Sequence, residues 1–100
     1  MYKFGNVTGN DKIDLANNII EYLGLKLNVD NDVNIGKRVK FKNPSCEMEK
    51  YIYIIICKQK CYGYDENGNY TLINGYRGIP ENNKNDFGRP FTLNDIYFID

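Results

Sequence analysis

The sequence predicts an α+β domain in which one N-terminal amphipathic helix packs on a strongly bent, barrel-like antiparallel sheet of four or five strands. Three observations lead to this prediction. Residues 11–23 repeat their apolar side chains with a helical period, several later segments alternate apolar and polar residues, and glycine, proline and asparagine separate the segments. With 100 residues, the chain has the length of one domain, which we assign to residues 1–100.

The helix over residues 11–23 is the best-defined element. Residues 2–4 are expected to form a short edge strand before it, and Asn10 or Asp11 can accept a hydrogen bond from the first turn as an N-cap. Gly24 suits the left-handed residue that ends a helix. A single apolar stripe predicts that this helix lies on a sheet, and the stripe consists of Ile13, Ala16, Ile19, Ile20 and Leu23.

Two alternating segments after the helix predict strands. Leucine and valine alternate with polar residues over residues 25–29, which predicts a short strand. In the segment GKRVKFKN, residues 36–43, Val39 and Phe41 point one way and the basic residues between them point the other. We expect a half-buried strand there, and its solvent face carries Arg38, Lys40 and Lys42.

The apolar run YIYIIIC, residues 51–57, predicts the longest strand. We expect Lys42 to face Tyr51 across an antiparallel pair. The even-numbered isoleucines of the run then point inward, and Tyr51 and Tyr53 point outward beside the lysines of the neighbouring strand.

A hairpin is predicted to follow this strand. The Asn-Gly pair at 67–68 favours a two-residue type I′ turn, after which the chain returns through residues 70–72. The alternation of the preceding strand would bring Lys58 and Lys60 into the core. We therefore expect a bulge or a sharp bend near residues 57–60.

The chain is predicted to end in a capped turn and a closing strand. Thr92, followed three residues later by Asp95, has the pattern of a capping box. Ile96 and Phe98 then predict the strand that completes the sheet.

Composition and charge exclude several classes of function. Thirteen basic and thirteen acidic side chains cancel, so no long-range field draws the whole molecule to nucleic acid or to an anionic membrane. The first residues are too polar for a secretion signal, and the longest apolar run is far shorter than the roughly 20 residues that cross a bilayer. We expect a soluble cytoplasmic protein with reduced thiols at Cys46, Cys57 and Cys61.

No catalytic or metal-binding motif stands out. Histidine is absent, which removes the usual general base and the commonest metal ligand. Two calcium-like patterns, at 30–34 and 65–69, lack the glycine and the closing glutamate of the helix-loop-helix calcium site and are typical of turns. The cysteines lack the close spacing of structural zinc ligands. We therefore expect no enzyme activity, no metal and no cofactor.

The first candidate binding surface is GYRGIPENNKNDFGRPF, residues 75–91, which shows neither a helical nor a strand period. Loops of this length are uncommon in compact domains and are often functional. Arginine beside aromatic residues is frequent at binding hot spots, and its fork also fits carboxylate or phosphate. Alternatively, both arginines pair with acids of the protein and only pin the loop. The residues expected to contact a partner are Tyr76, Arg77, Arg89 and Phe91.

The second candidate surface is basic and aromatic. Small barrels hold single-stranded nucleic acid with cations that meet phosphates and rings that stack on bases. The alternative is a solvated sheet face whose lysines protect an edge from aggregation, and the net charge of zero favours this alternative. The residues of this surface are Arg38, Lys40, Lys42, Tyr51 and Tyr53.

The sequence favours a non-catalytic binding or inhibitor module that contacts a protein or a small anionic ligand through residues 75–91. Fifteen asparagines, twelve isoleucines, ten lysines and nine tyrosines follow the codons of an AT-rich genome. This composition is common among phage and mobile-element accessory proteins, so we expect an anti-defence type of role in a host cytoplasm. Nucleic-acid binding through the basic surface is the alternative. A homodimer through a tyrosine-rich face is also left open, and no membrane partner is expected.

Overall fold

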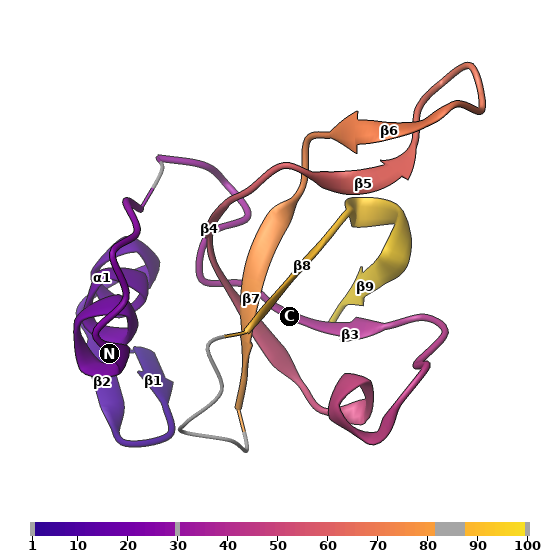
Figure 1. The fold of residues 1–100 in the computed structure, drawn as a ribbon. Helices are drawn as coiled ribbons and strands as arrows, with labels where there is room; N and C mark the ends of the chain where they lie inside the picture. The colour runs from indigo at the N-terminus through magenta and orange to yellow at the C-terminus, as the bar shows by residue number, and fades with distance from the viewer. Residues whose placement is uncertain (1, 30, 82–87, 100) are drawn as a thin grey trace.

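The computed structural model describes residues 2–29, 31–81 and 88–99. One helix lies beside a five-stranded sheet, and two short hairpins lie at opposite ends of this body (Figure 1). The elements in chain order are β1 (Tyr2–Phe4), β2 (Val7–Gly9), α1 (Lys12–Leu23), β3 (Arg38–Phe41), η1 (Glu47–Lys50), β4 (Tyr53–Lys58), β5 (Cys61–Tyr64), β6 (Tyr70–Ile73), β7 (Tyr76–Pro80), β8 (Arg89–Phe91), η2 (Leu93–Asp95) and β9 (Ile96–Phe98), where η marks a 3-10 helix.

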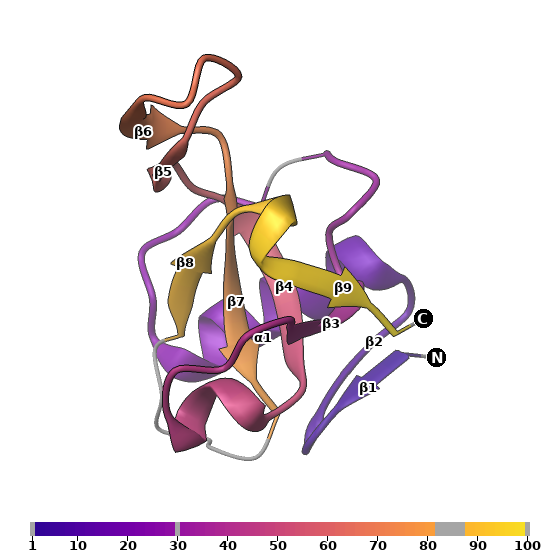
Figure 2. The same ribbon diagram turned by 90° about the vertical axis from the view of Figure 1, so that its right-hand side faces the viewer.

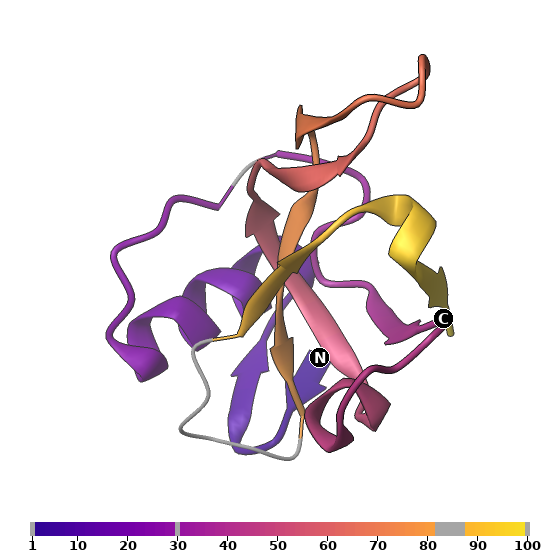
Figure 3. The same ribbon diagram turned by 45° about the vertical axis from the view of Figure 1, so that its right-hand side comes forward.

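The main sheet is antiparallel throughout and has the strand order β8-β7-β4-β3-β9. Its two edge strands, β8 and β9, follow each other in the chain, so the sheet curls until the short η2 helix bridges its edges (Figure 3). The predicted α+β fold, with one helix on a strongly bent antiparallel sheet of five strands, is confirmed. The helix is N-terminal as expected, but the β1–β2 hairpin precedes it.

Helix α1 begins and ends where the sequence predicts. The Asp11 side chain accepts a hydrogen bond of 2.8 Å from the Asp14 N–H, and Gly24 adopts the left-handed conformation at φ 68°. The helix lies behind the sheet in Figure 2 and packs on β4. Its fully buried residues are Leu15, Ala16, Ile19 and Ile20.

Strand β4 is buried on both faces, because α1 covers one side of the sheet and the curled sheet covers the other. This explains why its sequence is a continuous apolar run instead of an alternating one. On the inner side, Phe41 packs edge-on against Tyr53 at 5.3 Å and against Phe91 at 5.5 Å between ring centroids. The residues of β4 that are at most 2% exposed are Tyr53, Ile54, Ile55, Ile56 and Cys57.

The predicted register between β3 and β4 is wrong by one residue. Arg38 pairs with Ile54, and Val39 pairs with Tyr53. Tyr53 therefore points into the core with Val39 and not outward with the lysines. A shift of one residue exchanges the two faces of a strand, and the apolar pattern could not fix the register because both faces of β4 are buried.

The strand predicted over residues 25–29 is absent. This segment has no strand pairing, and Leu25, Leu27 and Val29 instead pack, partly buried, against the core. The alternation of apolar and polar residues in this segment therefore reflects which side chains are buried, not the pleat of a strand. A strand that the sequence did not predict, β2, pairs with β1, and the Asn18 side chain donates a hydrogen bond of 2.8 Å to the Thr8 carbonyl to join this hairpin to the helix.

The hairpin predicted after β4 is present as β5 and β6, but its turn is longer than two residues. Tyr64 pairs with Tyr70, so five residues connect the strands. The Asp65 side chain accepts the backbone N–H groups of Asn67 and Asn69, each at 2.9 Å. A type I′ turn needs a positive φ at both central residues, whereas among the described residues only glycines, here Gly68, have one.

The predicted bend and the predicted chain end are confirmed. The β4–β7 register shifts between Ile55 and Cys57, and the chain leaves the main sheet after Lys58, which stays exposed. At the other end, the Thr92 N–H and hydroxyl donate to the Asp95 carboxylate at 2.9 Å and 3.0 Å in the expected capping box.

Candidate functional site

Residues 75–91 are not the irregular loop that the sequence predicted. They contain strands β7 and β8, and the part of the prediction that covers 82–87 lies outside the described residues. Tyr76 and Phe91 face each other across these strands and are 8% and 1% exposed. These two aromatic residues therefore pack in the core, and little of either side chain is exposed to a partner.

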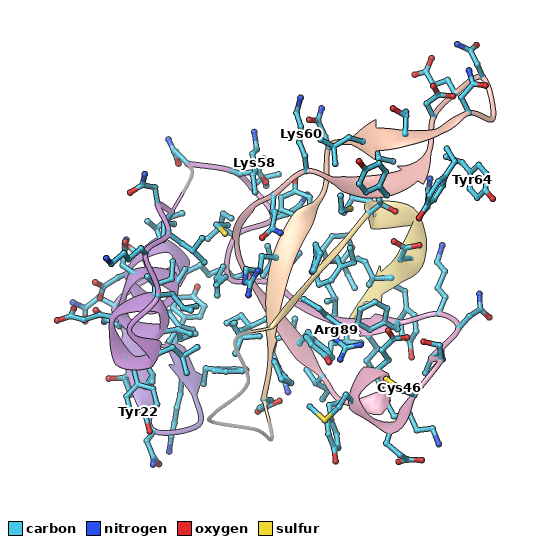
Figure 4. All side chains as sticks on the ribbon, viewed as in Figure 1. Tyr22, Cys46, Lys58, Lys60, Tyr64 and Arg89 are labelled. Atoms are coloured by element: carbon cyan, nitrogen blue, oxygen red, sulfur yellow. The ribbon has the colours of Figure 1, made fainter. Side chains whose placement is uncertain are left out.

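The two arginines of this segment lie apart and make contacts within the protein. Arg89 donates to the Glu49 carboxylate at 2.8 Å and lies 3.7 Å from the Cys46 sulfur (Figure 4). Arg77 is half-buried and donates to the Gln59 side-chain oxygen at 3.2 Å. These contacts favour the alternative in which both arginines bind groups of the protein itself and pin the segment.

Glu49 receives several hydrogen bonds besides the Arg89 ion pair. The Ser45 backbone N–H and hydroxyl both donate to it at 2.8 Å. The pKa of the Glu49 carboxyl lies below its ordinary value, and the main cause is the hydrogen bond from the Ser45 N–H. Burial raises this pKa, whereas the Ser45 hydroxyl and the Arg89 guanidinium lower it further. This cluster ties the β3–β4 connection to β8.

The predicted basic and aromatic surface is not assembled as expected. Tyr53 is fully buried and donates its hydroxyl hydrogen to the Met48 carbonyl at 2.8 Å, so its ring cannot stack on a base. Arg38 forms an ion pair of 3.1 Å with Glu81, and Tyr51 packs partly buried against the core. Lys40 is half-buried and Lys42 is exposed, and the aromatic residue opposite Lys40 is Tyr97 of β9 instead of a predicted ring of β4.

A surface that the sequence analysis missed lies on the β5–β6 hairpin, which projects away from the main sheet (Figure 1). Tyr62 pairs with Leu72 and Tyr64 pairs with Tyr70, so all four side chains lie on one face of the hairpin. We call these four residues the tyrosine face. Its members are exposed by 67% (Tyr62), 69% (Tyr64), 65% (Tyr70) and 49% (Leu72).

The rings of the tyrosine face touch one another. The centroid of Tyr70 lies 5.8 Å from that of Tyr62, in a stacked arrangement, and 5.3 Å from that of Tyr64. Residues 61–73 also carry two acidic side chains, Asp65 and Glu66, and no basic one. The hairpin thus presents a cluster of tyrosine rings with negative charge beside it.

The opposite face of the hairpin attaches it to the body. A methyl group at Gly63 would lie 2.9 Å from the Ile73 side chain and 3.3 Å from that of Thr92, so glycine allows the hairpin to approach η2. Cys61 is 8% exposed, and burial, helped by the nearby Asp95 carboxylate, raises the pKa of its thiol. The hairpin therefore presents its other face, the tyrosine face, to solvent.

An open cleft of about 540 Å³ lies at the base of this hairpin. On one side of it, the Tyr76 hydroxyl donates to Asp32 at 3.0 Å and accepts from the Asn34 side-chain amide at 3.0 Å. Lys58 lies 3.4 Å from the other Asp32 oxygen. The residues that line the cleft are Asp32, Lys58, Gln59, Lys60, Ile73, Asn74, Gly75, Tyr76, Thr92, Leu93 and Asn94.

Two groups of this cleft have shifted pKa values. Burial by itself raises the pKa of the Asp32 carboxyl, but hydrogen bonds from the Asn34 N–H and Tyr76, together with Lys58, outweigh it and keep the pKa below the ordinary 3.8. Burial also raises the pKa of the Tyr76 phenol above 10.0, and the Asp32 charge adds to this shift. Asp32 is therefore ionised and Tyr76 neutral at neutral pH.

The chain matches no protein-family model, no curated protein and no solved structure. Among the described residues, no three acidic or cysteine side chains come together as a metal ion would require. No helix in the described part of the chain is long and apolar enough to cross a membrane. The tyrosine face and the cleft are therefore the candidate binding surfaces of the chain.

Proposed function

We propose that the protein is a non-catalytic binding module that contacts a partner protein through the tyrosine face. The observation that carries this proposal is the placement of three tyrosines, each about two-thirds exposed, on one face of a projecting hairpin. Tyrosine is enriched in protein interfaces because it offers a large, rigid, amphipathic contact area at low cost in conformational entropy.

The size and the charge of the tyrosine face bear on whether its partner is a second copy of the chain. At roughly 150–250 Å² per aromatic side chain, three partly exposed tyrosines offer on the order of 300–500 Å². A stable interface buries about 800 Å² on each partner, so the tyrosine face can form only the centre of a larger contact, whichever partner binds it. Two copies would bring together hairpins that carry Asp65 and Glu66 without any basic residue.

Charge complementarity favours a partner that presents arginine or lysine to this surface. A cation can lie over a tyrosine ring, which contributes about 0.5–1 kcal/mol at an exposed site. The Glu66 carboxylate lies only a few residues along the chain from the tyrosines and is exposed. The same charge disfavours nucleic acid at this face, because phosphates would meet carboxylates.

The role suggested by composition fits this proposal. An inhibitor of anti-defence type, encoded by a phage or mobile element and acting in a host cytoplasm, works by occupying the surface of another protein and needs no catalytic group. Nucleic-acid binding through Lys40 and Lys42 has less support, since the Tyr53 ring is buried in the core and cannot stack on a base.

The test is a capture experiment with quantitative follow-up. Immobilised wild-type protein is exposed to host lysate, and each captured protein is purified for affinity measurement with the wild type and with the double variant Tyr64→Ser, Tyr70→Ser. The control is Tyr22→Ser on α1, which removes a tyrosine that is 56% exposed elsewhere on the surface. Binding should weaken at least tenfold for the double variant and stay unchanged for the control. Equal affinities for all three proteins would overturn the proposal.

A further inference from the structure

We propose that the cleft at the base of the β5–β6 hairpin binds a small ligand through a phosphate or carboxylate group held by Lys60 and the side-chain amides of Asn74 and Asn94. This site lies outside the tyrosine face and adds a second kind of ligand to a protein-binding module. Its volume of about 540 Å³ falls within the roughly 300–1,000 Å³ that small-molecule sites occupy.

The cleft forms where four segments of the chain meet. The α1–β3 connection contributes Asp32, the end of β4 and the residues after it contribute Lys58 to Lys60, the β6–β7 connection contributes Asn74 and Gly75, and the η2 region contributes Asn94. Gly75 fixes this meeting point, since a methyl group there would lie 2.8 Å from the Cys61 sulfur and clash with the Phe91 carbonyl. The polar side chains are thus presented by a tightly packed base.

The negative charge of Asp32 is already neutralised within the protein. One oxygen accepts hydrogen bonds from the Tyr76 hydroxyl at 3.0 Å and from the Asn34 backbone N–H at 2.9 Å, and the other faces Lys58 at 3.4 Å. Asp32 is the one carboxylate among the described lining residues, which also include Lys58 and Lys60. Two cations and one anion give the lining residues one net positive charge, which favours an anion.

Lys60 supplies this unbalanced charge. It is exposed, and among the described residues no carboxylate forms an ion pair with it. Figure 4 shows Lys58 and Lys60 directed the same way from neighbouring points of the ribbon. Lys58 helps to fix the loop at Asp32, whereas Lys60 makes no ion pair that stabilises the described fold. An oxyanion at the cleft would accept hydrogen bonds from the ammonium and from the amides of Asn74 and Asn94.

The site can be tested by titrating the ¹⁵N-labelled full chain with inorganic phosphate and, separately, with succinate, at an ionic strength held constant with sodium chloride. The expected result is a saturable shift of the backbone amide signals of residues 59–60, 74–75 and 93–94. Saturation by phosphate alone would identify a phosphate-bearing ligand, and saturation by succinate alone would identify a carboxylate. Saturation by both would support recognition of the shared oxyanion.

A pair of variants completes the test. Lys60→Gln should weaken binding roughly tenfold or more, the effect of losing a hydrogen bond to a charged group. Lys26→Gln removes the same charge from an exposed lysine outside the cleft and should leave binding unchanged. The absence of saturable shifts with both anions, or equal weakening by the two variants, would overturn the proposal.

Discussion

The Tyr76 hydroxyl donates a 3.0 Å hydrogen bond to Asp32, a residue 44 positions earlier in the chain. This bond joins β7, an inner strand of the main sheet, to the connection between α1 and β3. Because the Asn34 amide donates to the same hydroxyl, the connection is held at two points. Tyr76 therefore has a structural role in the fold, although the sequence favoured it as a contact residue.

Replacing Tyr76 by phenylalanine should lower the free energy of unfolding by about 1–3 kcal/mol, because the ionised Asp32 loses a hydrogen bond in a partly buried site. Urea unfolding measures this loss. Tyr22→Phe, which alters an exposed tyrosine on α1, is the control and should have no effect beyond about 0.5 kcal/mol.

The same variant should change the pH dependence of stability. The pKa of Asp32 is lowered in the folded protein, so its contribution is complete above the pKa of the unfolded chain, about 3.9, and is lost as the pH falls through the folded value. In the Tyr76→Phe variant, the pKa of Asp32 in the folded protein moves closer to its value in the unfolded chain. The variant should therefore lose less stability than the wild type when the pH falls from about 6 to about 3. Identical pH profiles would contradict this account of Asp32.

The Arg89–Glu49 ion pair should contribute measurably to stability. Glu49→Gln removes the charge that Arg89 and the Ser45 donors share, and we expect a loss of about 1–3 kcal/mol in urea unfolding. Glu47→Gln is the matched control, since Glu47 pairs with Lys50 on the surface and its side chain is 82% exposed. A surface pair contributes about 0–1 kcal/mol, and equal losses in both variants would show that the Arg89 pair is also weak.

The parts of the fold that local chemistry determines could be predicted from the sequence. Asp11 and Gly24 mark the ends of α1, and the Thr92–Asp95 capping box opens the turn before β9. Each of these signals involves residues a few positions apart, so no knowledge of distant contacts is needed. Lys58 and Lys60 likewise predicted the bend that leads the chain out of the main sheet.

The candidate site could not be predicted, because it depends on register and on long-range contacts. With the predicted two-residue turn, Tyr64 would pair with Thr71 and the tyrosine face would be divided between two sides of the hairpin. The observed five-residue connection pairs Tyr64 with Tyr70 and gathers the rings on one side. The sequence left open whether Arg89 is paired, and it could not identify the partner Glu49, which lies 40 residues away.

The one-residue error in the β3–β4 register leads to a direct test. Tyr53→Ala should cost about 3–5 kcal/mol of unfolding free energy, because Tyr53 is fully buried against Phe41. Tyr64→Ala, on the tyrosine face, should change stability by no more than about 0.5 kcal/mol. If Tyr53→Ala does not fold, Tyr53→Phe still measures the bond from the hydroxyl to Met48, at about 1 kcal/mol. A stable, unperturbed Tyr53→Ala protein would instead support the outward-facing tyrosine of the original register.

The acidic charge beside the tyrosine face predicts how association with a basic partner depends on salt. Glu66→Lys should slow association, because long-range attraction between opposite charges raises the association rate, and this rate should become less sensitive to salt than that of the wild type. Glu21→Lys makes the same change of charge on an exposed position of α1, away from the hairpin, and controls for net charge. Stopped-flow measurements at low and high salt would separate the two variants. If both slow association equally, attraction is due to the net charge of the molecule and not to the hairpin, and the partner need not present basic residues to the tyrosine face.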